Sequence, residues 1–145
     1  MKGHCRFLRV QGGKCYFAHV ELDVFPDSNG ITLDETMPEK VNADAGEVNE
    51  QTAPTWVASA QEGIHAAIDQ ARPLGLLPGG CRVRLTKLVG SFVDTREDVV
   101  RCAAALATWQ GLGGPEPGPE AVFNGQVWNL LFPAAVGKPA REKSA

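Results

Sequence analysis

Apolar and polar residues alternate along two stretches of the chain, and this alternation is typical of half-buried β-strands. In the first stretch the apolar positions are Tyr16, Ala18, Val20, Leu22 and Val24. In the second stretch the apolar positions are Cys81, Val83 and Leu85. The two patterns predict strands over residues 16–25 and from 81 to about 89.

Turn-forming residues indicate how the N-terminal strands connect. Gly12 and Gly13 follow a short apolar stretch at 7–10, so we expect a strand there and a hairpin turn at the two glycines. Asn29-Gly30 predicts a second turn, after which a third strand starting at Ile31 should run back antiparallel. Residues 34–50 are acidic and show little periodicity, which indicates an irregular connection with room for a short strand near Val41 or Val48.

Helical spacing of apolar residues begins at Pro54. The expected buried stripe of this helix, which should end before Pro73, is Val57, Ala60, Ile64, Ala67 or Ile68, and Ala71. A second helix is expected after residue 94, with Asp94 or Thr95 as its N-cap and Glu97 and Asp98 in its first turn. Its expected buried stripe is Val99, Cys102, Ala103, Leu106 and Ala107.

Composition divides the chain into one domain and a C-terminal extension. With 145 residues and 43% hydrophobic content, the chain suffices for one domain, expected over residues 1–112. Residues 113–120 are rich in Pro and Gly and predict a linker, and residues 138–145 should be a disordered tail. Residues 121–137 are too apolar to remain in solvent, so we expect them to dock on the domain, on a partner or on a second copy through Trp128, Leu130 and Phe132.

The sequence predicts a soluble cytoplasmic protein. No apolar run approaches the roughly 20 residues of a membrane span, and Arg6 and Arg9 interrupt any secretory signal at the N-terminus. The four cysteines include no Cys-x-x-Cys pair, which favours reduced thiols over disulfides or a structural zinc site.

Charge is distributed unevenly, although the formal net charge is only −3. Residues 1–20 carry four basic side chains and no acid, whereas residues 21–50 carry nine acids and Lys40 as the single basic residue. We therefore expect one basic and one acidic edge. The basic edge is consistent either with local anion binding or with an ordinary solvated surface.

None of the candidate catalytic patterns is complete. Lys14 follows two glycines as in a phosphate-binding loop, but Cys15 replaces the required hydroxyl residue and a strand follows in place of a helix, so no nucleotide is expected. His19 is compatible with a base or a metal ligand, yet Glu21 shares its strand face and a hydrogen-bonded structural histidine is the commoner outcome. Zinc binding by His4, Cys5, Cys15 and His19 competes with the simpler interpretation of free thiols. We therefore expect no enzyme activity, no cofactor and no metal.

Several short motifs occur in an order that belongs to one known domain. Residues 12–20 read Gly-Gly-Lys-Cys-Tyr-Phe-Ala-His-Val, residues 61–64 Gln-Glu-Gly-Ile, residues 77–79 Leu-Pro-Gly as a looser match, residues 83–85 Val-Arg-Leu and residues 90–94 Gly-Ser-Phe-Val-Asp. In this order, between about residues 7 and 110, the chain resembles the fourth domain of elongation factor G, the translocation GTPase. Three positions depart from the family pattern: Lys14 stands for arginine, Cys15 for glycine and Val93 for histidine.

This resemblance implies a fold and a site. The fold is an α+β two-layer sandwich, with a four-stranded, mostly antiparallel sheet, two helices on one face and a left-handed βαβ crossover. The family uses its first hairpin and the Gly-Ser-aromatic turn as a tip that touches tRNA and ribosomal RNA. The residues expected to contact RNA here are Arg9, Gly12, Gly13, Lys14, Tyr16, His19, Gly90, Ser91, Phe92 and Asp94.

Two functions follow from these observations. The first is a free-standing binding module, without a GTPase domain, that contacts the ribosome or RNA. The second is a protein-interaction or dimerisation domain that keeps the fold but has lost RNA binding, and uses the acidic segment and the region around Trp128. The basic first hairpin favours the first function, and the overall acidity together with Val93 favours the second.

Overall fold

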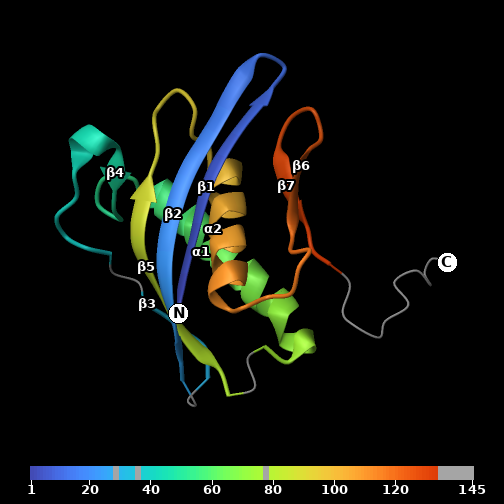
Figure 1. The fold of residues 1–145 in the computed structure, drawn as a ribbon. Helices are drawn as coiled ribbons and strands as arrows, with labels where there is room; N and C mark the ends of the chain where they lie inside the picture. Colours follow the sequence, from blue (N-terminus) through green and yellow to red (C-terminus); the bar gives the residue numbers. More distant parts are fainter. Residues whose placement is uncertain (28–29, 35–36, 77–78, 134–145) are drawn as a thin grey trace.

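The computed structural model describes residues 1–27, 30–34, 37–76 and 79–133, and it consists of one sheet, two helices and a C-terminal hairpin (Figure 1). The strands of the N-terminal region are β1 (Lys2–Gln11), β2 (Lys14–Pro26), β3 (Thr32–Asp34) and β4 (Glu47–Val48). They are followed by α1 (Pro54–Ala71), β5 (Cys81–Val89), α2 (Glu97–Gly111), β6 (Glu120–Phe123) and β7 (Trp128–Leu131). Two short 3-10 turns, η1 (Ala43–Ala45) and η2 (Arg72–Leu74), complete the elements.

The main sheet has the strand order β1-β2-β5-β3, and β4 pairs with the other end of β5. Strands β1, β2 and β5 are antiparallel neighbours, whereas β3 runs parallel to β5. Both helices cover one face of this sheet, and no helix of the described residues covers the opposite face (Figure 1). The expected α+β two-layer sandwich is therefore confirmed, with one short strand more than the four expected.

The chain passes from β3 through α1 to its parallel neighbour β5, which is a βαβ crossover. In Figure 1 strand β5 points upward, the helices lie behind the sheet, and β2 lies to the right of β5. A connection that passes behind the sheet from left to right is left-handed, against the usual preference.

Strand β1 starts five residues before the expected strand at Phe7. Its positions facing the helices are Gly3, Cys5 and Phe7, of which only Phe7 is large and apolar, so the early part of the strand shows no alternation of hydrophobicity. Gly3 allows the backbone of β1 to touch α2, because a Cβ at this position would overlap the carbonyl of Ala107. Gly3 therefore belongs to the strand, and its small size serves the close contact with α2.

The core is built from the apolar stripes that the sequence predicts. Tyr16, Ala18, Val20, Leu22 and Val24 of β2 are all buried, as are the corresponding residues of β5. Helix α2 packs against β1 and β2 and also against α1, so that small residues on several of its sides are fully buried: Cys102, Ala103, Ala104, Ala105 and Ala107. Helix α1 crosses α2 at Gly63, where an added Cβ would overlap the carbonyl of Arg101.

One local prediction was right in direction but not in pairing, and another was wrong. The strand after Gly30 does run opposite to β2, but it pairs with β5, which inserts between them, and so no β2–β3 hairpin forms. The second helix begins at Glu97, its N-cap is Arg96, and no side chain caps it. Thr95 is occupied elsewhere, because its hydroxyl donates to the carbonyl of Phe17 at 2.6 Å. Asn29 and Leu77-Pro78, which supported the second turn and part of the family resemblance, lie outside the described residues.

The C-terminal extension folds back on its own domain. Trp128 is only 2% exposed, while Leu130 and Phe132 are half-buried. The preceding Pro/Gly segment packs around Trp109, whose indole N–H donates to the carbonyl of Pro115 at 3.2 Å. Of the three expected docking places, the domain itself is the one that residues 121–133 occupy, whereas residues 134–137 and the tail over 138–145 lie outside the described residues. No helix in the described part of the chain has both the length and the apolar character needed to cross a membrane.

The helix crossing at Gly63 gives a direct test of the packing. Replacing Gly63 with Ala improves helix propensity by about 1 kcal/mol, but the added methyl meets the α2 backbone. We expect Gly63→Ala to lower the free energy of unfolding by roughly 1–3 kcal/mol, the usual cost of overpacking. Urea denaturation followed by circular dichroism measures this change.

Ala58→Gly is the matched control, because Ala58 lies on the exposed side of α1. Removal of its methyl group should cost about 1 kcal/mol through helix propensity alone. A Gly63→Ala variant more stable than the parent would contradict the close contact between α1 and α2.

Candidate nucleic-acid interface

The β1–β2 hairpin ends in an exposed glycine turn. Gly12 and Gly13 have φ angles of 60° and 78°, which belong to the left-handed region and match the twist required of a two-residue hairpin turn. No atom of a described residue would lie within 4 Å of a Cβ at either position, so this part of the structure leaves the backbone of the turn open. A ligand can therefore approach the turn closely.

The turn over residues 90–94 is fastened to β2 beside this hairpin end. The N–H of Phe17 donates to the carbonyl of Asp94 at 3.0 Å, and the Thr95 hydroxyl donates to the carbonyl of Phe17. The same hydroxyl accepts the N–H of Ser91 at 2.8 Å, so Thr95 holds the turn closed. We call the two turns together, residues 12–16 and 90–94, the tip.

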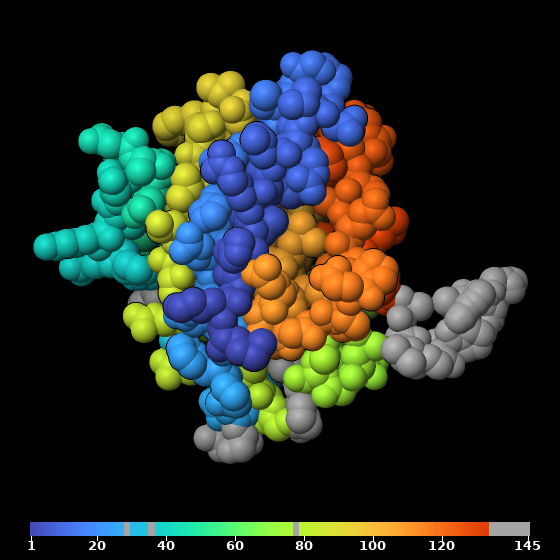
Figure 2. All heavy atoms as spheres, viewed as in Figure 1, coloured from blue at the N-terminus to red at the C-terminus, as the bar shows by residue number. Residues whose placement is uncertain are grey.

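Space-filling atoms show how the tip projects from the molecule. In Figure 2 the β1–β2 hairpin end (blue) protrudes between the turn after β5 (yellow) and the β6–β7 hairpin (orange to red). Phe92 in the tip is 99% exposed and Val93 is 81% exposed. Leu8 and Val10 of β1 add two further exposed apolar side chains near the same end.

Three basic side chains lie over aromatic rings at the tip. The Lys14 ammonium lies 5.7 Å from the centre of the Tyr16 ring, and the Arg96 guanidinium lies 5.3 Å from it. The Arg9 guanidinium lies 4.6 Å from the centre of the Phe7 ring. Arg9 and Lys14 form no ion pair with any described residue, so their charge is not neutralised within the described structure.

A cluster of aromatic rings supports these cations from below. Trp128 packs edge-on against Phe7 and Tyr16, with ring centres 5.2 and 5.7 Å apart, and Phe123 packs on both Tyr16 and Trp128. Edge-to-face pairs of this kind add about 0.5–1.5 kcal/mol each beyond the burial of apolar area. The C-terminal hairpin therefore completes the floor of the tip.

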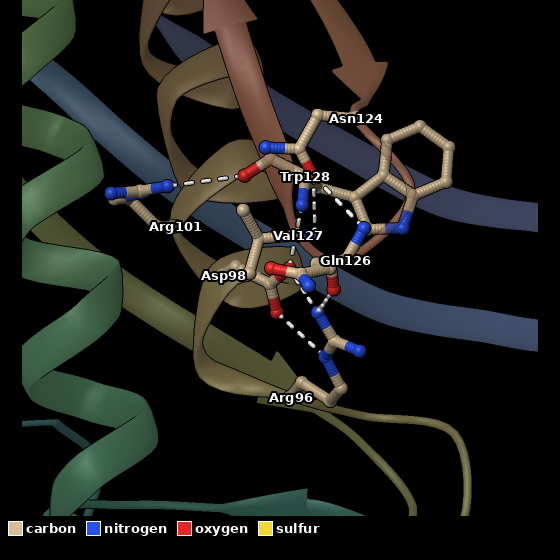
Figure 3. A network of polar contacts seen from close by, with 7 residues as sticks. All are labelled: Arg96, Asp98, Arg101, Asn124, Gln126, Val127 and Trp128. Carbon is tan, nitrogen blue, oxygen red and sulfur yellow. Dashed lines mark hydrogen bonds and ion pairs between the residues drawn. The ribbon is translucent and has the colours of Figure 1, made fainter.

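Polar contacts from α2 hold that hairpin in place (Figure 3). Asp98 accepts the backbone N–H of Trp128 at 2.7 Å, and Arg101 donates to the Trp128 carbonyl at 3.1 Å. Arg96 forms a bidentate pair with Asp98, at 3.0 and 2.6 Å, and also donates to the carbonyl of Gln126. Asn124 closes the hairpin turn by accepting the N–H groups of Gln126 and Val127.

The environment of Asp98 keeps its side chain ionised. Burial alone would raise the pKa of this carboxyl group, but the hydrogen bonds from Arg96 and from the Trp128 N–H outweigh it and hold the pKa below its ordinary value. The ionised Asp98 in turn fixes the Arg96 guanidinium against the Tyr16 ring.

The remaining residues of the expected site occupy different environments. Tyr16 is 4% exposed and belongs to the core, so its ring is not available to a ligand at the surface. His19 lies farther along β2 and bonds Glu21 at 2.8 Å, a contact that lowers the pKa of Glu21. Gly90 is required by packing, because a Cβ there would lie 2.7 Å from the Trp56 ring. Arg9, Gly12, Gly13, Lys14, Ser91, Phe92 and Asp94 remain at or near the tip surface.

The cysteines and histidines of the first hairpin do not converge. Cys5 pairs across the sheet with buried Val20 and faces the helices, whereas His19 pairs with Arg6 on the opposite face. Burial raises the pKa of Cys5 to about 11, and the same cause raises the pKa of Cys102 to about 11. The described residues hold no group of three or more side chains able to bind a metal ion.

Arg96, whose guanidinium lies over the Tyr16 ring next to the tip, is the residue that sequence reasoning missed. Its place beside Tyr16 depends on Asp98 and on a hairpin that begins more than 20 residues later. In the sequence, Arg96 is simply a basic residue just before the first turn of a helix, and nothing around it indicates a contact with Tyr16.

Comparisons with known proteins give the fold and no activity. No family model and no curated protein matches the chain. A protein of Thermus thermophilus, known by crystal structure, is similar with a TM-score of 0.55 and 20% sequence identity. The similarity covers 75% of this chain and 15% of that protein.

The charge of Asp98 should stabilise the docked hairpin. We expect Asp98→Asn to reduce the free energy of unfolding at pH 7 by roughly 1.5–3 kcal/mol, the range for a hydrogen bond to a charged group. A lowered native pKa gives stability that is present above the unfolded-state pKa and is lost as pH falls through the native value. The difference between parent and variant should therefore shrink below about pH 4.

Denaturation curves at several pH values measure this difference. Asp69→Asn is the matched control, since Asp69 is exposed on α1 and forms no ion pair among the described residues. If Asp98→Asn were as stable as the parent at pH 7, the network in Figure 3 would not be holding the hairpin.

Proposed function

We propose that this chain is a non-enzymatic binding module that contacts the ribosome or RNA through its tip. The observation that carries the proposal is the pair of unneutralised cations, Arg9 and Lys14, beside an open glycine turn. The resemblance to the tip domain of elongation factor G, based on the motifs at residues 12–20 and 90–94, supports the same surface.

Phosphate binding accounts for the basic side chains. Lysine and arginine bind phosphate oxygens and release counterions from the nucleic acid, which supplies affinity without sequence specificity. The exposed backbone at Gly12 and Gly13 adds N–H groups that a phosphate can approach because no side chain shields them. Lys14 keeps the charge of the family arginine but lacks its bidentate geometry, so we expect point contacts with phosphate.

Stacking accounts for the exposed ring. Phe92 is 99% exposed and the adjacent Val93 is 81% exposed, so the turn presents neighbouring apolar side chains that a ligand can cover. An unpaired RNA base offers a flat apolar surface, and stacking of a base on an aromatic side chain contributes about 1–3 kcal/mol. Val93, where the family has histidine, preserves apolar contact and removes a hydrogen-bonding group.

A protein partner is the second candidate function, and one observation favours it. Leu8 and Val10 are 50% and 63% exposed on β1, the edge strand of the sheet. With Phe92 and Val93 they provide exposed apolar surface near the tip, which is typical of a protein interface. Trp128 is buried in its own domain and contributes no surface to such an interface.

Charge reversal at Lys14 distinguishes the two candidates. We expect Lys14→Glu to weaken binding to ribosomes or to an RNA hairpin, and to reduce the salt dependence of the affinity by about one phosphate contact. The fold should be unaffected because Lys14 is exposed at the end of a hairpin. Co-sedimentation with ribosomes at several salt concentrations measures both quantities.

Lys40→Glu is the matched control, because it makes the same change of charge at an exposed position in the acidic segment. Its binding curve should have nearly the same salt slope as that of the parent. Equal binding by parent and Lys14→Glu, or no binding by the parent at low salt, would favour the protein partner.

A further inference from the structure

A concave site lies beside the projecting tip and has a different character. It is a cleft of about 680 Å³. Its walls come from the η1–β4 segment, the first turn of α1, the turn after β5 and Glu97. This volume is within the range of pockets that hold a ligand group. We call it the Trp56 cleft.

The cleft has an apolar lining. Trp56 is half-buried, and its ring is held against the backbone of Gly90, where a Cβ would lie 2.7 Å from the ring. Val48, Pro54 and Phe92 add further apolar surface. A large apolar side chain inserted among these residues would be removed from water on most sides.

The wall formed by the acidic segment is pre-organised. Asn49 is 3% exposed, and its amide donates to the carbonyls of Pro38 and Glu39, both at 3.2 Å. Its side-chain oxygen accepts the N–H groups of Gln51 and Thr52. Because these bonds already fix the entry to α1, a ligand does not need to order this wall on binding.

The charge around the cleft is negative. Glu47 and Glu97 line it, and its lining includes no Lys, Arg or His. Glu97 forms no ion pair with a described residue, and the carboxylate of Glu47 lies 3.7 Å from the Lys87 ammonium. Asp44, exposed on η1, adds a further negative charge nearby. An RNA phosphate is repelled by such a surface, whereas a basic group is attracted.

We propose that the Trp56 cleft binds a basic peptide segment of a partner protein. One large apolar side chain of the peptide packs on Trp56, and lysine or arginine residues on either side of it face Glu47 and Glu97. The proposal does not depend on RNA binding by the tip, since it uses a different set of charges.

Tryptophan fluorescence gives a local readout, because Trp109 and Trp128 are 3% and 2% exposed and Trp56 is half-buried. The probe is a nine-residue peptide of lysines with a central phenylalanine. Iodide should quench mainly the fluorescence of Trp56 in the free protein. We expect the peptide to reduce this quenching at peptide concentrations below about 1 mM. Matched peptides with serine for phenylalanine, or with glutamates for lysines, should bind several-fold more weakly.

Variants assign the binding to the cleft. Anisotropy of the labelled peptide should show about threefold weaker binding to Glu97→Gln, the effect of losing an exposed ion pair. Glu120→Gln, an exposed acid at the start of β6, and Lys14→Glu at the tip should bind the peptide as the parent does. In Trp56→Phe the change in fluorescence should disappear.

Three results would overturn the proposal. One is equal binding of the acidic peptide, another is unchanged affinity in Glu97→Gln, and the third is no protection of Trp56 at the highest peptide concentration. Stronger protection of Trp56 by a single-stranded RNA than by the basic peptide would assign the cleft to an RNA base instead.

Discussion

Burial of Trp128 against Phe7 and Tyr16 is the interaction on which the geometry of the tip depends. It brings a hairpin from the end of the chain under the first hairpin, and the backbone of the same residue is bound by Asp98 and Arg101. Asp98 then positions Arg96 beside Lys14 over the Tyr16 ring. Removal of Trp128 would therefore disturb the packing of Phe7 and Tyr16 in the core. It would also disturb the position of the Arg96 charge beside the tip, more than 20 residues away in sequence.

Periodic burial explains why most of the fold was predictable. The strands β2 and β5 and the helix α1 bury regular stripes of large or medium apolar residues, which local sequence reveals. The failures have a common cause in contacts made across long sequence distances. Thr95 bonds Phe17 in place of capping α2, Gly3 extends β1 by packing on α2, and β5 inserts between β2 and β3. The glycines and Lys14 of the tip were visible in the sequence, whereas Arg96 was not, because its place depends on the C-terminal hairpin.

The basic N-terminal residues and the acidic residues that follow them in sequence lie on different parts of the molecule. The first hairpin carries Arg9 and Lys14 without acidic partners among the described residues, and the segment around η1 and β4 contributes Asp44 and Glu47. The turn after β5 lies between them, since it is bonded to Phe17 on one side and to Gly46 on the other. A net charge of −3 therefore conceals a surface with a basic and an acidic region separated by one turn.

The most direct test of RNA binding at the tip is to map amide chemical-shift changes in isotope-labelled protein on addition of a decoding-site RNA hairpin at low salt. Our account predicts the largest changes at Gly12, Gly13 and Lys14 and at residues 91–94, with all of them diminishing as salt is raised. Changes centred on the opposite end of the sheet, around Pro26 and Cys81, or no changes at low salt, would contradict it.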